Sequence, residues 1–266
     1  MSWAYGELSD GREIGYSVPD VCNAPGCQVK IDRGLAYVCG GMHEGGDWGC
    51  GKYFCEDHRN VGPVPGGEYV QLCDDCLKRW EGWRDRQAEL QTKLIYAIVV
   101  AGKSARFANE AMQRLKDEVD SDAGELLFDF LNRKREAGEL RKTLEQHRTG
   151  NYTKLEKAIG ELLEEAFDLD EVTPEDLERI HGIGPKTARF FIVWTRPAER
   201  YAVLDVHVLR WMADQGYRVP HSTPQSPQHY RRIEGWFLEE AAKRRLTPRQ
   251  LDLEIWGKAA RFPNVV

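Results

Sequence analysis

Residues 177–188 read LERIHGIGPKTA, and this stretch decides the fold. Two glycines, Gly182 and Gly184, bracket a single apolar residue, and Pro185 follows directly. Glycine permits a tight backbone turn and a close approach to a ligand, and proline is favoured at the first position of a helix. The stretch therefore predicts a helix that ends near Ile180, a tight turn, and a second helix that begins at Pro185.

The residues before the turn carry a helix start of their own. Thr173 is followed by Pro174, Glu175 and Asp176, which places an N-cap residue before a proline and two acids in the first turn. Two helices joined by a glycine turn form a helix-hairpin-helix motif. The unpaired amides at the start of the second helix attract anions, so we expect the motif to bind a DNA phosphate without reading sequence.

The amino-acid composition and the spacing of apolar residues both change near residue 80. All seven cysteines lie between Cys22 and Cys76, in a segment rich in glycine and proline. Beyond this segment, apolar residues recur at helical spacing and strand-like alternation is scarce. We therefore predict a mainly α protein, with a small N-terminal zinc-binding domain at residues 1–80 and a helical domain at residues 81–266.

The cysteine segment has the composition of a metal site. Seven cysteines and one histidine complete two tetrahedral zinc sites without an open position, so we expect two structural zinc ions. The predicted ligands are Cys22, Cys27, Cys39, Cys50, Cys55, His58, Cys73 and Cys76. Metal is preferred over disulfides because the first twenty residues lack the basic and apolar character of a secretory signal.

Residues 50–58, CGKYFCEDH, resemble the zinc core of cross-braced fingers of the FYVE type. The resemblance implies that the first and third ligand pairs hold one ion and that the second and fourth pairs hold the other. The second pair would join Cys39 to Cys50, and the gap between them is longer than in those fingers. His43 is therefore a rival ligand in place of Cys50.

Bulk properties limit the function classes. The net charge is −6 over 266 residues, which weighs against a protein that coats nucleic acid but permits one local basic face. No run of eighteen apolar residues exists, so we expect no membrane span. The chain is expected to be a cytoplasmic, nucleoid-associated monomer.

A second stretch of sequence, downstream of the predicted hairpin, carries a candidate catalytic residue. Residues 201–210 read YAVLDVHVLR, and they place Asp205 nineteen positions after Lys186, at the boundary between an extended apolar run and a new helix. A lysine at this place in the hairpin is by itself compatible with simple phosphate contact. The downstream aspartate is what favours catalysis.

Together, GIGPKTA and LDVHV resemble the helix-hairpin-helix DNA glycosylase superfamily, over about residues 90–260. The resemblance implies that Lys186 and Asp205 are the catalytic pair of a bifunctional DNA glycosylase and AP lyase in base excision repair. It further implies phosphate contacts by His207 and by the hairpin, where a monovalent cation is also expected. The hairpin residues concerned are His181, Gly182 and Gly184.

The expected partner is double-stranded DNA with a damaged base flipped into a pocket. Phe190 lies one helical turn after Lys186, and Asp252 lies one turn before Trp256. This arrangement resembles the archaeal type of 8-oxoguanine glycosylase, in which two aromatic residues hold the lesion and an aspartate bonds its Watson–Crick edge. Packing of these residues in a core is the ordinary alternative.

Two other function classes stay open. A glycosylase fold can act on a hypermodified base, as in phage or defence systems. A hairpin and a zinc finger can also form a noncatalytic DNA-binding adaptor. The pairing of Lys186 with Asp205 favours the glycosylase over the adaptor.

Overall fold

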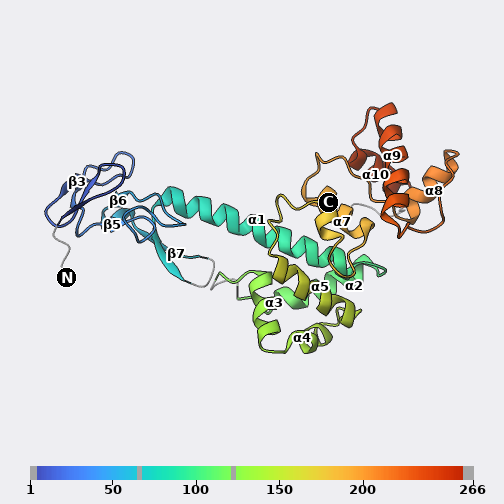
Figure 1. The fold of residues 1–266 in the computed structure, drawn as a ribbon, viewed down its shortest axis with the longest axis horizontal. Coiled ribbons are helices and arrows are strands. Elements are labelled where there is room, and N and C mark those ends of the chain that lie inside the picture. The colour runs from blue at the N-terminus through green and yellow to red at the C-terminus, as the bar shows by residue number, and fades with distance from the viewer. Residues whose placement is uncertain (1–4, 65–67, 121–123, 260–266) are drawn as a thin grey trace. The chain divides into compact units, whose positions relative to one another are not determined.

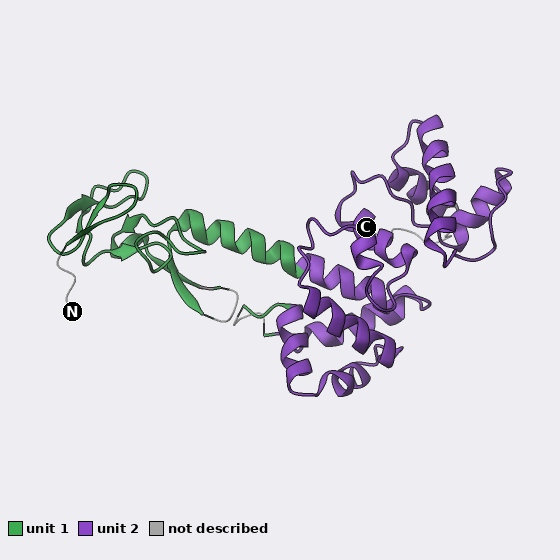
Figure 2. Ribbon diagram, in the orientation of Figure 1, with its two compact units in different colours: residues 1–88, 120–126 green, residues 89–119, 127–266 purple. Residues whose placement is uncertain are grey.

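The computed structural model describes residues 5–64, 68–120 and 124–259. In these ranges, ten α-helices accompany four small antiparallel sheets of two strands each (Figure 1). The predicted mainly α class is confirmed. The chain divides into two compact units, of which unit 1 comprises residues 1–88 and 120–126 and unit 2 comprises residues 89–119 and 127–266 (Figure 2).

Unit 1 is built from four hairpins of short strands that are followed by the first turns of a helix. The pairs are β1 (Gly6–Glu7) with β2 (Glu13–Ile14), β3 (Pro19–Val21) with β4 (Lys30–Asp32), β5 (Tyr37–Val38) with β6 (Tyr53–Phe54), and β7 (Asn60–Pro63) with β8 (Tyr69–Leu72). A 3-10 turn, η1 (Glu56–His58), joins β6 to β7. Strands of two to four residues cannot enclose an apolar core by themselves.

The core of unit 1 consists largely of its cysteines. Five of the eight buried residues in its cluster are cysteines, and the other three are Ala24, Phe54 and Leu72. A thiol contributes little apolar area, and its thiolate is a metal ligand. The unit therefore depends on something other than apolar burial for its stability.

Helix α1 (Asp74–Val99) runs through the domain boundary predicted between residues 80 and 81, and the two units meet along the chain at residue 88. The helix starts between two predicted metal ligands, Cys73 and Cys76. Its later turns contribute Leu90 and Leu94 to the core of unit 2. One continuous helix therefore contributes residues to both units. The change in amino-acid composition near residue 80 does not predict this continuity.

Unit 2 contains the last turns of α1 and nine further helices within the described ranges. They are α2 (Ala105–Lys116), α3 (Leu127–Glu136), α4 (Leu140–Gln146), α5 (Tyr152–Glu165), α6 (Pro174–Leu177), α7 (Pro185–Thr195), α8 (Val206–Asp214), α9 (Pro227–Lys243) and α10 (Pro248–Ala259). The predicted capping of α6 is confirmed, because the Thr173 hydroxyl accepts from the Asp176 amide and the Asp176 carboxylate accepts from the Thr173 amide. Helix α10 starts at Pro248, and the hydroxyl of Thr247 before it accepts from the amide of Gln250.

Two apolar clusters make up the interior of unit 2. The first gathers buried residues from α1 to α7, and the second gathers Ala202 and Leu204 with residues of α8, α9 and α10. Helix α7 belongs to the first cluster, and it is joined to α9 of the second cluster through buried Arg189 and Glu234. The segment with Lys186 thus connects to the segment that leads into Asp205.

A search of the described helices for a stretch long and apolar enough to cross a bilayer finds none.

Candidate functional site

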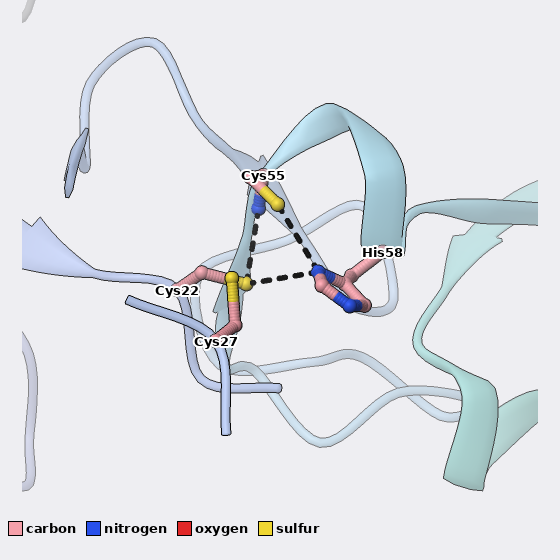
Figure 3. A group of neighbouring side chains, drawn as sticks. All are labelled: Cys22, Cys27, Cys55 and His58. Carbon is pink, nitrogen blue, oxygen red and sulfur yellow. Dashed lines mark hydrogen bonds between the residues drawn. The ribbon is translucent and has the colours of Figure 1, made fainter. Parts of the chain in front are cut away.

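The first metal-ligand cluster contains Cys22, Cys27, Cys55 and His58, whose side chains point toward one another (Figure 3). Nδ1 of His58 lies 3.1 Å from Sγ of Cys55 and 3.6 Å from Sγ of Cys22. The amide of Cys55 donates to Sγ of Cys22 at 3.4 Å. Such a bond stabilises a thiolate and fixes its direction.

The second cluster contains Cys39, Cys50, Cys73 and Cys76. Sγ of Cys50 and Sγ of Cys73 are 3.9 Å apart, and the amide of Cys73 donates to Sγ of Cys39 at 3.2 Å. In each cluster all four ligand atoms lie within 4.8 Å of one another. The chain can therefore hold two metal ions, with the first and third pairs around one and the second and fourth around the other.

The separations fit a tetrahedral ion. Zinc–sulfur bonds of about 2.3 Å place two sulfurs of a tetrahedral site about 3.8 Å apart. His43, the rival ligand, belongs to neither cluster, because its Nδ1 lies 2.8 Å from the hydroxyl of Tyr53. Four protein ligands at each site leave no position for a reacting water molecule.

A wound glycine loop closes the long gap between Cys39 and Cys50. Gly49 donates to the carbonyl of Gly45, and Gly51 donates to the carbonyl of Cys39, which returns the chain to its starting point. A Cβ atom on Gly49 would lie 2.3 Å from the oxygen of Cys39. The glycine density of residues 40–51 is the sequence signal for this closure.

The hairpin of unit 2 has the predicted turn, but its first helix is shorter than expected. Helix α6 ends at Leu177, because the amides of Arg179 and Ile180 bond to carbonyls three residues back and tighten the chain. Gly182 has a φ of 82°, and a Cβ atom there would collide with the side chain of Lys154. Glycine is therefore required at this position.

Amides at the hairpin differ in their availability to an anion. The amide of His181 donates to the carboxylate of Glu161, so it is already engaged. Gly184 caps α7, and the first bond of that helix is donated by Ala188 to the carbonyl of Gly184. The amides of Lys186 and Thr187 precede this bond, and they are the ones that a phosphate can use.

Asp205 caps helix α8. Its Oδ1 accepts from the amides of His207 at 2.8 Å and Val208 at 2.9 Å, and the residue is buried. This is the geometry of a helix cap, and it uses one of the two carboxylate oxygens. Oδ2 has no hydrogen-bond donor in the described part of the chain, so a cap and a second role for Asp205 are compatible.

Asp252 connects the predicted catalytic pair to the predicted pocket. Burial and the charge of Asp205 raise the pKa of Asp252 to about 7, while the charges of Lys186 and Arg249 oppose the rise. The charges of residues on the hairpin, at the start of α8 and on α10 therefore all act on Asp252. Oδ1 of Asp252 is buried and has no hydrogen-bond partner among the described residues.

The predicted aromatic residues each have a ring partner. Phe190 stacks on Trp194 at 5.3 Å, with an interplanar angle of 20°, and it packs against the first apolar cluster. Trp256 is 40% exposed, and its ring lies 4.7 Å from that of His207. His207 is therefore brought beside the pocket residue Trp256, whereas Phe190 lies in an aromatic group with Trp194.

Sequence reasoning missed a buried polar network behind the site. Arg189 is 1% exposed, and its Nε donates to both oxygens of Glu234 at 2.8 and 2.9 Å. Arg189 also donates to Glu178, which precedes the turn. Burial lowers the pKa of the Arg189 guanidinium, but the negative charge of Glu234 and the hydrogen bonds to Glu178 and Glu234 outweigh it, so the pKa is raised. A charged residue within the apolar run 188–194 was the available signal.

The comparisons with known proteins add no family. No family model matches the chain, and no solved structure gives a significant match.

Substitution of Gly49 by alanine tests the second metal cluster. Because the added Cβ atom would lie 2.3 Å from the Cys39 carbonyl, we expect Gly49→Ala to displace Cys50 and to reduce bound zinc from two ions to about one per chain. Elemental analysis of purified protein measures this. Gly82→Ala is the matched control, since a Cβ atom there meets nothing within 4 Å. Two ions in Gly49→Ala would mean that the loop does not hold the site closed.

The raised pKa of Asp252 predicts that the free energy of unfolding falls as the pH rises. The folded protein must hold an ionised, buried carboxylate above pH 7, whereas the unfolded chain ionises near 3.8. Stability is therefore lost as the pH rises from about 4 through 7. Asp252→Asn should raise the free energy of unfolding at pH 8 by roughly 1–4 kcal/mol, because it removes the charge whose burial is unfavourable, and by less at pH 5.

Thermal unfolding of Asp252→Asn at the two pH values is the measurement. Asp214→Asn, an exposed aspartate on α8, is the control and should change stability little at either pH. An equal gain from Asp252→Asn at pH 5 and pH 8 would show that the carboxylate is not penalised by its surroundings.

Proposed function

We propose that the chain is a bifunctional DNA glycosylase and AP lyase that excises a damaged base, with Lys186 as nucleophile and Asp205 as its assisting carboxylate. The observation that carries the proposal is the set of charges that meet at Asp252. Burial and Asp205 raise its pKa while Lys186 opposes them, and its Oδ1 is buried without a donor. A perturbed, unsatisfied carboxylate near a lysine is characteristic of a functional site.

The proposed chemistry follows from the residue types. The neutral amine of Lys186 attacks the anomeric carbon of the flipped nucleotide, and the bond to the base breaks. The carboxylate of Asp205 stabilises the positive charge that develops on the sugar. The resulting Schiff base permits β-elimination, which cuts the strand on the 3′ side. Amides at the start of α7 hold a neighbouring phosphate meanwhile.

The proposed substrate is 8-oxoguanine. Ionised Asp252 can accept from the N1–H and N2–H₂ donors of a guanine edge, which would satisfy its buried Oδ1. Trp256 is exposed enough to stack on a base. Its contact with His207 supports a site in which base recognition and phosphate contact are adjacent. We also propose that zinc fills the two clusters of unit 1 as a structural metal.

Borohydride trapping tests the nucleophile. Lys186→Gln should abolish the covalent adduct and strand cleavage, because glutamine cannot form a Schiff base, while the dissociation constant for lesion DNA stays within a few-fold. Lys154→Gln, on α5, keeps Lys186 intact and should still form the adduct. An adduct that persists in Lys186→Gln would assign the chemistry to another amine. No adduct with any lesion in the unmodified protein would favour the noncatalytic adaptor.

Asp205→Asn separates capping from catalysis. Asparagine retains an oxygen for the amides of His207 and Val208, so the fold should survive. The loss of the negative charge should lower the single-turnover rate by roughly two to four decades. An unchanged rate would leave Asp205 with capping alone.

A lesion panel under single-turnover conditions tests substrate choice. We expect 8-oxoguanine to be excised ahead of uracil, thymine glycol and 3-methyladenine, because a guanine edge offers the carboxylate of Asp252 two neighbouring donors and these bases do not. Asp252→Ala should slow excision of the lesion without creating activity on guanine, and Trp256→Ala should lose about 1–3 kcal/mol of stacking. Faster cleavage of thymine glycol or uracil would contradict the pocket and leave the Lys186 chemistry standing. Preference for an unusual modified base would favour the phage or defence alternative.

A further inference from the structure

A single buried tyrosine holds the segment that leads into Asp205. Tyr230 lies on α9 and is fully buried. Its hydroxyl donates to the carbonyl of Ala202 at 2.8 Å and accepts from the amide of Leu204 at 2.9 Å. Two of the three residues directly before Asp205 are therefore fixed by one side chain, although they belong to no helix or strand.

Glu234, one turn further along α9, holds the same segment through a different atom of Ala202. Its Oε1 accepts from the amide of Ala202 at 2.9 Å and from Nε of Arg189 at 2.8 Å. Arg189 lies three residues after Lys186 on α7. An unbroken series of buried hydrogen bonds thus runs from the helix that carries Lys186 to the segment that carries Asp205.

We propose that Tyr230 is a positioning residue, which acts with the Glu234–Arg189 pair to set the carboxylate of Asp205 relative to the amine of Lys186. This inference rests on the proposed function. None of the three side chains is exposed to substrate, since Tyr230 and Arg189 are at most 1% exposed and Glu234 is 5% exposed. Their effect on the reaction passes through the backbone.

A displacement of the backbone before Asp205 would also displace its carboxylate, because hydrogen bonds restrict the movement of this side chain. Its Oδ1 is bonded to the amides of His207 and Val208, so the carboxylate moves with the start of α8. Thr223 adds a further restraint by donating to the carbonyl of Leu204 at 2.8 Å. A displacement of about 1 Å at a reacting group can cost roughly 100-fold in rate.

Tyr230→Phe is the test, because it removes only the hydroxyl. In single-turnover trapping on a duplex with 8-oxoguanine, adduct formation should slow roughly 10- to 100-fold, while the dissociation constant for the same duplex changes less than about 2-fold. Tyr217→Phe is the matched control. Its hydroxyl also bonds to α9, at Glu240, but is not bonded to residues 202–205, and its rate should equal that of the unmodified protein.

A double-mutant cycle separates positioning from a general loss of structure. If Tyr230 acts through Asp205, then Tyr230→Phe should slow an Asp205→Asn protein by less than about 2-fold. A slowing as large as that in the unmodified background would mean that Tyr230 acts independently of Asp205, and it would overturn the inference.

Glu234→Gln keeps the result decisive if Tyr230→Phe does not fold at the assay temperature. Glutamine retains an acceptor for the amide of Ala202 but removes the charge that faces Arg189, and it should give the same loss of rate with unchanged affinity. Trapping by the unmodified protein together with equal rates for Tyr230→Phe and Tyr217→Phe would refute the positioning role alone. No trapping by the unmodified protein would refute the proposed function and, with it, this inference.

Discussion

The buried guanidinium of Arg189 is the interaction on which the arrangement of unit 2 depends. It donates to Glu178 before the turn and to Glu234 on α9, so one side chain closes the hairpin and joins α7 to the second apolar cluster. A charge in such a place is stable only when its partners are present, and loss of one partner from a buried pair costs about 3–5 kcal/mol. The network therefore makes the hairpin and the 202–205 segment a single structural element, whatever ligand the hairpin binds.

Unit 1 differs from unit 2 in how its fold can be stabilised. Most residues of its buried cluster are ligand cysteines and its sheets have two strands each, so burial of apolar area gives it little support. An ion held by four of these side chains would stabilise the unit, because it would constrain the whole chain between them. The loop that brings Cys50 to its cluster depends on glycine for a steric reason, since any side chain at Gly49 would occupy the position of the Cys39 carbonyl.

The buried carboxylate of Asp252 lowers the stability of the fold when it is ionised. Its buried oxygen lacks a donor, and the neighbouring charge of Asp205 opposes its ionisation. A purely structural position would favour an apolar or paired residue. Among the described residues, nothing offsets this cost by donating to Oδ1 of Asp252.

The sequence by itself determined the features that act over a few residues. The chelating pairs, the cap at Thr173, the glycine turn and the start of α7 at Pro185 all depend on local chain geometry. The cross-braced pairing of the ligands was implied by the resemblance of residues 50–58 to cross-braced fingers. Only the tertiary structure showed that Arg189 pairs with Glu234 and that the charge of Asp205 acts on Asp252, and these interactions link positions 45 or more residues apart. It also placed the ring of His207 against that of Trp256 and ran α1 across the predicted boundary. Such contacts arise from how helices pack, and helical periodicity says which face is buried but not what that face meets.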